Sequence, residues 1–306
     1  MRKYIIKRIL LCFLVLFGVS IISFGILHLT PGDPARLLLP DGSSQQEINE
    51  LRERLGLNKP LQVQFLIYIR GAIKGDLGTS LYFRKPNLDL IKERALATLL
   101  LASAAVFGSL LVGLPLGVTA GFKQGSKVDF FTMFFALLGQ AISPVWLGFL
   151  LIFTFSVKLK ILPSFGYGNI QALILPAITL GFPLAALIAR LVRAGTIDVL
   201  SEDYILAIRA KGIGEKKIVM RYALKNVLIP VTTIVGMEFA SIMGGAIVTE
   251  NIFSWPGLGT LAIHAIYGRD FPLVQAIVLV VAALFVSINL SVDIVCTLFD
   301  PRLKFN

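Results

Sequence analysis

The sequence is poor in charged residues. Only 15% of its 306 residues are Asp, Glu, Lys or Arg, against about 25% in ordinary soluble domains, and 56% are hydrophobic. The mean hydropathy of +0.81 comes from apolar runs that are too long for helices buried in a soluble core. The composition excludes a soluble globular protein and predicts an all-α, polytopic membrane protein.

Cysteine and histidine are almost absent. Cys12 and Cys296 both lie in apolar runs, which excludes a disulfide framework and a CxxC zinc cluster. His28 and His264 have no HxxxH spacing and no nearby Cys. We therefore predict that this chain binds no metal.

Motifs for nucleotide binding and catalysis are also missing. The sequence has no GxxxxGK[ST] loop to hold phosphates and no GxSxG nucleophile turn, and the stretch from Gly117 to Lys123 has the wrong spacing. The chain is predicted to be no enzyme, to hold no cofactor of its own and not to hydrolyse ATP by itself.

Six apolar segments are long enough to cross a bilayer, which requires about 20 residues each. The formal charge of +11 then fits anchoring of cytoplasmic loops better than nucleic-acid binding. An even number of spans places both termini on one side. The predicted spans are Ile9–Leu29, Ala97–Gly121, Phe130–Val157, Leu173–Arg193, Val227–Thr249 and Leu273–Phe299.

The first apolar segment resembles the start of a signal peptide because four basic residues precede it. It is long for a signal sequence, however, and it runs into Thr30-Pro31-Gly32-Asp33-Pro34 without a small-x-small cleavage site. We interpret it as a retained span.

Basic residues predict the orientation. The predicted loops carry 16 Lys and Arg on one side and 13 on the other, and 10 of those 13 lie in segment 30–96, which is too long for the positive-inside rule. Both termini are therefore predicted to be cytoplasmic.

The chain divides by these loops into three predicted parts. Residues 1–96 form the first span and a long extracytoplasmic segment, 97–299 form a five-helix core with a cytoplasmic loop at 194–226, and 300–306 form a cytoplasmic tail.

Within the extracytoplasmic segment, Ser44–Gly56 is predicted to be a surface helix. The stretch Leu61–Arg70 is too short to span, so it lies along the membrane face or packs on the spans. Turns are predicted around Gly71, Gly75 and Gly78.

Small residues and prolines predict how the spans pack. Gly113, Gly117 and Gly121 share one face of the second span and allow close approach of another helix, although glycine is also simply common in membrane helices. Pro144 in the third span, and Gly181 with Pro183 in the fourth, are expected to break or kink their helices.

Glu238 is an acidic residue near the middle of the fifth span. Facing lipid would cost it about 2.5–3.5 kcal/mol on insertion scales. It is predicted to line a translocation path together with Ser241 and Gly245; the alternative is a paired or protonated structural Glu.

The cytoplasmic loop between spans four and five predicts a helical hairpin. Ser201–Gly212 starts with a capping residue and acids and ends in Lys-Gly, Gly212–Gly214 turns the chain, and a basic second helix covers Glu215–Lys225. Such a hairpin suits docking of a soluble partner, and the alternative is a positive-inside loop with incidental helices.

At this loop the sequence resembles the membrane subunits of binding-protein-dependent ABC importers, in their dipeptide, oligopeptide and nickel branch. Of the general EAA-x-x-x-Gly signature, Ala207 and Gly212 match, whereas Leu206 and Ile208 depart. The peptide branch's own version of the motif survives at Ala207, Arg209, Ala210, Lys211, Gly212, Ala223, Leu224, Asn226 and Pro230.

Four further stretches are similar to the same branch and follow its order along the whole chain. They are Pro31–Pro34, Gly75–Gly78, Glu250–Gly259 and Asp300–Arg302.

The resemblance implies a type I importer permease with a methionine-importer-like transmembrane domain in a prokaryotic cell membrane. It implies a homologous second permease, two ATP-binding subunits that hold ATP-Mg, an extracytoplasmic substrate-binding protein and membrane lipid as partners, and no nucleic acid. The implied coupling residues are Glu202, Asp203, Tyr204, Ala207, Arg209, Ala210, Lys211 and Gly212.

Three alternatives stay open at this level. The substrate is a di- or oligopeptide, but nickel, a metal chelate or glutathione is also compatible with the branch. A self-sufficient channel or secondary transporter could use Glu238 for proton coupling, against which stand the hairpin and the lack of inverted similar halves. A membrane-embedded enzyme would need a nucleophile, base or metal cluster that the sequence does not show.

Overall fold

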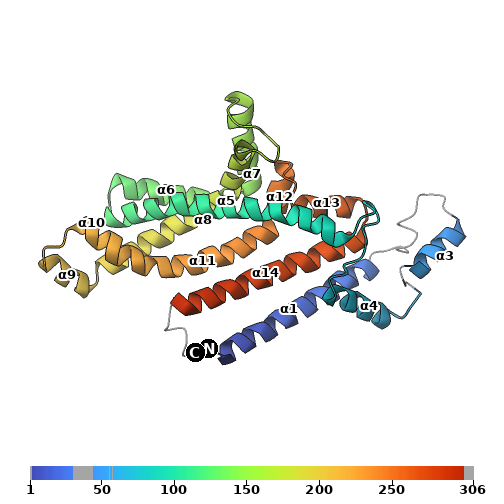
Figure 1. The fold of residues 1–306 in the computed structure, drawn as a ribbon. Coiled ribbons are helices and arrows are strands. Elements are labelled where there is room, and N and C mark those ends of the chain that lie inside the picture. Colours follow the sequence, from blue (N-terminus) through green and yellow to red (C-terminus); the bar gives the residue numbers. More distant parts are fainter. Residues whose placement is uncertain (1, 30–43, 55, 57, 300–306) are drawn as a thin grey trace. The chain divides into compact units, whose positions relative to one another are not determined.

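The computed structural model describes residues 2–29, 44–54, 56 and 58–299, and these are almost entirely helical (Figure 1). No β-strand forms in these ranges, so the prediction of an all-α protein is confirmed. The motif stretches Pro31–Pro34 and Asp300–Arg302 lie outside the described residues.

The chain folds into two compact units that both draw on separated parts of the sequence. Unit 1 combines residues 1–97 with 256–287, and unit 2 combines 98–255 with 288–306. The long helices α5 (Asn87–Phe122) and α14 (Phe271–Phe299) contribute to both units.

Unit 1 contains the first apolar helix and the short helices that follow it. Helix α3 (Gln45–Arg54) begins with a capping box, in which the Ser44 Oγ accepts from the Glu47 amide at 3.2 Å and the Glu47 carboxylate accepts from the Ser44 amide at 2.8 Å. Helix α4 (Leu61–Ile73) packs on α1 (Arg2–Leu29) through ring contacts of Phe65 with Phe24, whose ring centroids lie 5.4 Å apart. The expectation that this short segment packs on a span is confirmed.

The turn after α4 differs in one detail from the sequence prediction. Gly75 and Gly78 have φ angles of +81° and +76°, which confirms turns at these positions. Gly71, by contrast, lies inside α4, so the turn predicted there is wrong. A Cβ on Gly71 would lie 2.9 Å from the Asp76 carbonyl oxygen, so this glycine lets the returning chain approach the helix.

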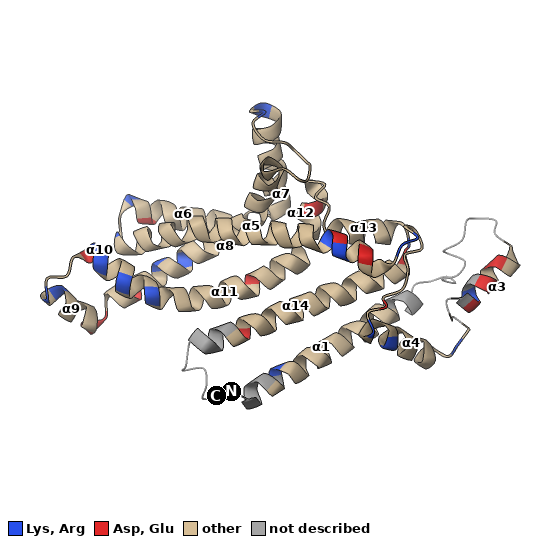
Figure 2. Ribbon diagram, in the orientation of Figure 1, with Lys and Arg blue, Asp and Glu red and all other residues tan. Residues whose placement is uncertain are grey.

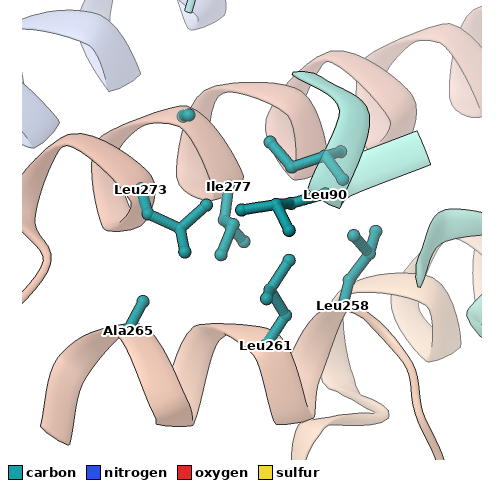
Figure 3. Packing of buried hydrophobic residues seen from close by; sticks show 8 residues of the cluster. Leu90, Leu258, Leu261, Ala265, Leu273 and Ile277 are labelled. Atoms are coloured by element: carbon teal, nitrogen blue, oxygen red, sulfur yellow. The ribbon is translucent and has the colours of Figure 1, made fainter. Parts of the chain in front are cut away.

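A hydrophobic core joins the first turn of α5 to α13 (Leu258–Tyr267) and the start of α14 within unit 1. Figure 3 shows its buried leucines and isoleucine pointing toward one another from the three helices. The residues of this core are Leu90, Ile91, Leu258, Leu261, Ala265, Leu273, Ala276 and Ile277.

Unit 2 is a bundle in which α8 (Ile170–Leu200) lies between α6 (Lys127–Ala141) and α11 (Leu224–Gly245) (Figure 1). Helix α7 (Pro144–Leu151) and the π-helical turn η1 (Ile152–Lys158) follow α6 at an angle of 107°. The break expected at Pro144 is therefore confirmed. It has a local cause, because Pro144 cannot continue a helix but suits the first position of a new one.

Within the described residues, five helices are long and apolar enough to cross a bilayer by themselves, and the bent pair α6 with α7 and η1 makes a sixth crossing if counted as one span. The chain is thus a multi-pass membrane protein. Helix α8 is not broken, because it continues through Pro176 and Pro183 from residue 170 to residue 200.

Candidate functional site

The loop between α8 and α11 forms a compact helical element at one end of unit 2. Helix α9 (Asp203–Ala210) is followed by a turn, the short helix α10 (Glu215–Ile218) and the π-helical turn η2 (Val219–Ala223), which continues into α11. The predicted first helix is present. The predicted second helix, Glu215–Lys225, does not end at residue 225, because the chain stays helical into the span.

Ser201 has a different role from the predicted N-cap of α9. Its Oγ donates to the Asp198 carbonyl at 2.7 Å, so it caps the C-terminus of α8. Glu202 takes the N-cap position of α9 instead, in extended backbone conformation and without a side-chain cap hydrogen bond. Acidic Glu202 and Asp203 still lie where the helix dipole favours them.

Helix α9 has an inner and an outer face. Ile205 is completely buried, and Ile208 and Arg209 are half-buried. The outer side presents mostly small or apolar side chains between the acidic pair Glu202 and Asp203 at one end and Lys211 at the other, an arrangement that suits docking of another protein. The exposed residues of this element are Glu202, Asp203, Tyr204, Leu206, Ala207, Ala210, Lys211 and Gly212.

Gly212 ends α9 in the left-handed conformation, with φ of +75°. Its amide donates to the Arg209 carbonyl at 2.9 Å, and the Lys211 amide donates to the Ile208 carbonyl at 3.2 Å, which satisfies the last carbonyls of the helix. A residue with a Cβ is disfavoured at this φ angle, which explains a glycine here.

Arg209 is held by the start of the next helix. Its Nε donates to Glu215 Oε1 at 2.7 Å and its Nη2 donates to Glu215 Oε2 at 3.2 Å. These hydrogen bonds to Glu215 raise the pKa of the Arg209 guanidinium. A further donor, Nη1, lies 3.4 Å from the Leu200 carbonyl at the end of α8.

Basic residues gather at this end of unit 2 (Figure 2). Lys216, Lys217, Arg221 and Lys225 follow one another from α10 into the start of α11, whereas the remainder of α11 carries Glu238 as its single charged residue. The polarity of the helix thus falls from the loop toward the membrane interior.

The predicted path residues lie along α11. Glu238 is half-buried and Ser241 and Gly245 are exposed, and the spacing i, i+3, i+7 places them on one side of the helix. A Cβ on Gly244 or Gly245 would meet no atom within 4 Å, so the end of this helix borders open space. Within the described part of the chain, the Glu238 carboxylate makes no hydrogen bond or ion pair.

The three packing glycines of α5 face α8. A Cβ on Gly113 would lie 2.7 Å from the Ala185 carbonyl oxygen, and one on Gly117 would lie 2.6 Å from that of Ala189. At Gly121 the nearest atom would be the Thr196 Cβ, also at 2.7 Å. Real Cβ atoms do not approach so closely, so α5 and α8 require glycine along this seam.

A cavity of 330 Å³ lies between α5, α6 and α8, and its lining is almost purely apolar, including Phe135, Ile178 and Phe182. It offers a polar ligand few groups to bind. In the described part of the chain, no cluster of three or more His, Cys, Asp or Glu is placed to hold a metal ion.

Two buried acidic residues of unit 2 were not predicted from the sequence. Asp129 pairs with Arg193 across α6 and α8, and Glu250 accepts from the Thr98 Oγ1 at 2.6 Å. The only local signal was the Ser126-x-x-Asp129 pattern of a helix start. Neither partner could be assigned without the fold, because 64 and 152 residues separate the pairs.

Comparison of the sequence with known families gives two matches that together cover nearly the whole chain. Residues 113–305 match the family described as binding-protein-dependent transport system inner membrane component. Residues 1–102 match the family of the N-terminal part of such membrane components.

Characterised relatives match over their full length. The chain is 40% identical over 333 residues to the dipeptide transport system permease protein DppB of Alkalihalophilus pseudofirmus, with 100% of both chains covered. It is also 40% identical over 305 residues to the glutathione transport system permease protein GsiC of Escherichia coli K12, again with 100% of both covered.

Solved structures share the fold at low sequence identity. The inward-facing MetNI methionine ABC transporter matches with a TM-score of 0.57 at 19% identity, over 69% of this chain and 96% of that one. An amino acid ABC transporter crystallised with histidines matches with a TM-score of 0.52 at 20% identity, over 70% of this chain and 94% of that one. The predicted methionine-importer-like fold is confirmed.

Proposed function

We propose that the chain, which belongs to the family of binding-protein-dependent transport system inner membrane components, is a pore-forming subunit of an ATP-driven importer of dipeptides or oligopeptides. The observation that carries this function is helix α9, a short helix between two spans with an exposed outer face that includes Tyr204, Leu206 and Ala207. The full-length similarity to a dipeptide permease supports the substrate class.

The proposed importer needs partner subunits, because this chain has no nucleotide-binding motif of its own. The sequence has no phosphate-binding loop, so ATP-Mg is bound by two ATP-binding subunits, and one of them docks on α9. A homologous second permease completes the pore, and an extracytoplasmic substrate-binding protein delivers the substrate. Closure of the ATP-binding subunits displaces α9 and alternates access through the pore.

The orientation is part of the proposal. Helix α9 and the basic residues that follow it face the cytoplasm, and both termini lie on the same side. The short loops on that side carry most of the Lys and Arg outside segment 30–96, which supports this orientation in a prokaryotic cell membrane.

Glu238, Ser241 and Gly245 are proposed to line the translocation path. A carboxylate at the middle of a span is costly in lipid and typically faces water or a partner group. A peptide carries an ammonium group at its N-terminus, which Glu238 would attract during passage. The open space beside Gly245 supports a path along this side of α11.

Glutathione is a second candidate substrate, because the glutathione permease is as similar to this chain as the dipeptide permease is. It is itself a small peptide with an ammonium group and two carboxylates. Uptake of radiolabelled dipeptides, longer peptides and glutathione by the reconstituted complex decides between them.

The docking role of α9 can be tested by one substitution with a matched control. Leu206 and Leu159 are 56% and 55% exposed, and they lie in α9 and directly after η1. In proteoliposomes with all partner subunits, Leu206→Asp is expected to abolish co-purification of the ATP-binding subunits and peptide uptake. Leu159→Asp should keep both subunits bound. Normal uptake by the Leu206 variant would contradict the proposed function.

A further inference from the structure

Arg209 belongs to the family motif of the loop, yet its side chain is turned toward the protein itself. All three of its guanidinium nitrogens lie near acceptors of this chain: two donate to Glu215 in α10, and the third points at the Leu200 carbonyl at the end of α8. The side chain is 35% exposed. Its donors are thus already engaged before any partner binds.

The geometry of this contact is favourable for both groups. The guanidinium and the carboxylate meet in the two-pronged arrangement that makes an arginine pair strong and directional. Arg209 lies in the last turn of α9 and Glu215 in the first turn of α10, so each charge also complements the dipole of its own helix. The Leu200 carbonyl is one of the terminal acceptors of α8 that have no partner within the helix.

A second contact ties the other part of α9 to the next span. The Asn226 Nδ2 donates to the Tyr204 hydroxyl at 3.1 Å, and Asn226 belongs to the first turn of α11. Helix α9 is therefore joined to the end of α8, to α10 and to α11 at separate points.

The turn between α9 and α10 is flexible, so side-chain contacts are needed to carry a movement of α9 to the spans. Gly212 and Gly214 border it, and glycine loses more conformational freedom on ordering than other residues, so such a turn bends readily. Without side-chain ties, a displacement of α9 would be absorbed by this turn and would not reach the spans.

We propose that Arg209 is a positioning residue. Its contacts with Glu215 and the Leu200 carbonyl, here called the clasp, hold α9 to α10 and α8, so that α9 and the adjoining ends of α8 and α11 move together. This inference rests on the proposed function. It assigns Arg209 to the transmission of movement and not to the binding of the ATP-binding subunit.

The clasp can be tested by charge reversal in the complete reconstituted importer. Arg209→Glu and Glu215→Arg should each leave the ATP-binding subunits bound, but lower the number of peptides imported per ATP hydrolysed by about three- to tenfold. The double variant restores the ion pair but not the contact with the Leu200 carbonyl, so partial recovery is expected. Arg209→Lys keeps the charge without the two-pronged geometry and should give an intermediate ratio.

Two controls separate this inference from the proposed function. Lys123→Glu reverses an exposed charge directly after α5, outside the hairpin, and should leave the transport ratio unchanged. Leu206→Asp tests docking itself, so its failure to release the ATP-binding subunits would overturn the proposed function and not the clasp alone.

A distance measurement tests the mechanical part of the proposal. Spin labels at Ala207 and Lys225, with the native cysteines replaced, should show a broadened distance distribution in Arg209→Glu and a narrow one in the double variant. The clasp is overturned if Arg209→Glu releases the ATP-binding subunits without rescue by Glu215→Arg. An unchanged transport ratio in both single variants would overturn it as well.

Discussion

The guanidinium of Arg193 donates two hydrogen bonds to the carboxylate of Asp129 and thereby ties α8 to the first turn of α6. The Asp129 side chain is only 7% exposed, and it also accepts from the Gly125 amide at 2.9 Å. The Ser126 Oγ in turn caps α6 by accepting from the Asp129 amide. The pair and its cap fix the turn between α5 and α6 against α8.

Removing the charge of Asp129 should therefore destabilise unit 2. Asp129→Asn leaves the guanidinium of Arg193 without its charge partner; because Arg193 is 23% exposed to solvent, we expect a cost of about 1–3 kcal/mol, below that of a fully buried pair. Asp198→Asn, which changes an exposed acid near the C-terminus of α8, is the matched control and should be neutral. Unfolding of the purified chain in mixed micelles measures both; equal stability of the two variants would show that the pair contributes little.

Two glycine substitutions on α5 should distinguish the effect of close packing on stability from the effect of helix propensity. Gly117→Ala places a Cβ 2.6 Å from both the Ala189 carbonyl oxygen and the Val192 Cβ, so α5 and α8 must move apart. Overpacking of this kind typically costs about 1–3 kcal/mol. Gly108→Ala, on the same helix with no atom within 4 Å, should be neutral or slightly stabilising. Thermal midpoints of the two variants in detergent check the difference.

Ser80 should be needed for the stability of unit 1. Its Oγ donates to the buried carboxylate of Asp270, which also accepts from the Tyr82 amide at 3.1 Å and the Leu273 amide at 3.3 Å. Ser80→Ala deprives a buried charge of one donor, at a cost of about 1–3 kcal/mol. Ser103→Ala, at an exposed position of α5, serves as control. Protease resistance of the purified chain reports the loss, and equal resistance would show that the remaining donors suffice.

The left-handed turn at Gly212 predicts an order of substitutions. A Cβ there would meet no atom within 4 Å, so any cost comes from the backbone conformation alone. Gly212→Asn should be tolerated, because Asn adopts this conformation readily, whereas Gly212→Val should lose about 1–2 kcal/mol or more and disorder the end of α9. ATP-binding-subunit association, measured by co-purification, is expected to follow the same order. Equal association of the two variants would show that docking of the ATP-binding subunits does not depend on this turn.

Glu238→Gln tests the translocation path. If the carboxylate attracts the peptide ammonium group, the variant should import unmodified peptides several-fold more slowly and lose preference over N-acetylated ones. Glu93→Gln, an exposed acid on α5, is the control. Normal import of every cationic and neutral peptide by the Glu238 variant would exclude a path role.

Much of the architecture could be predicted from the sequence because it depends on local properties. The length of the apolar runs determines which segments cross the bilayer, and Pro144 ends one helix and begins the next. The helix at 203–210 follows from the acids before it and from Gly212 after it. The order of motifs along the chain was likewise sufficient to identify the family.

Only the tertiary structure decided which side chains meet. Nothing in the spacing of the sequence pairs Asp129 with Arg193 or Ser80 with Asp270, because such pairs depend on how distant helices are placed. The same holds for Arg209, which the family resemblance implies as a coupling residue and whose side chain the fold places against Glu215. Local sequence preferences determine where the helices of this protein form. The packing between the helices determines which charged side chains pair with each other.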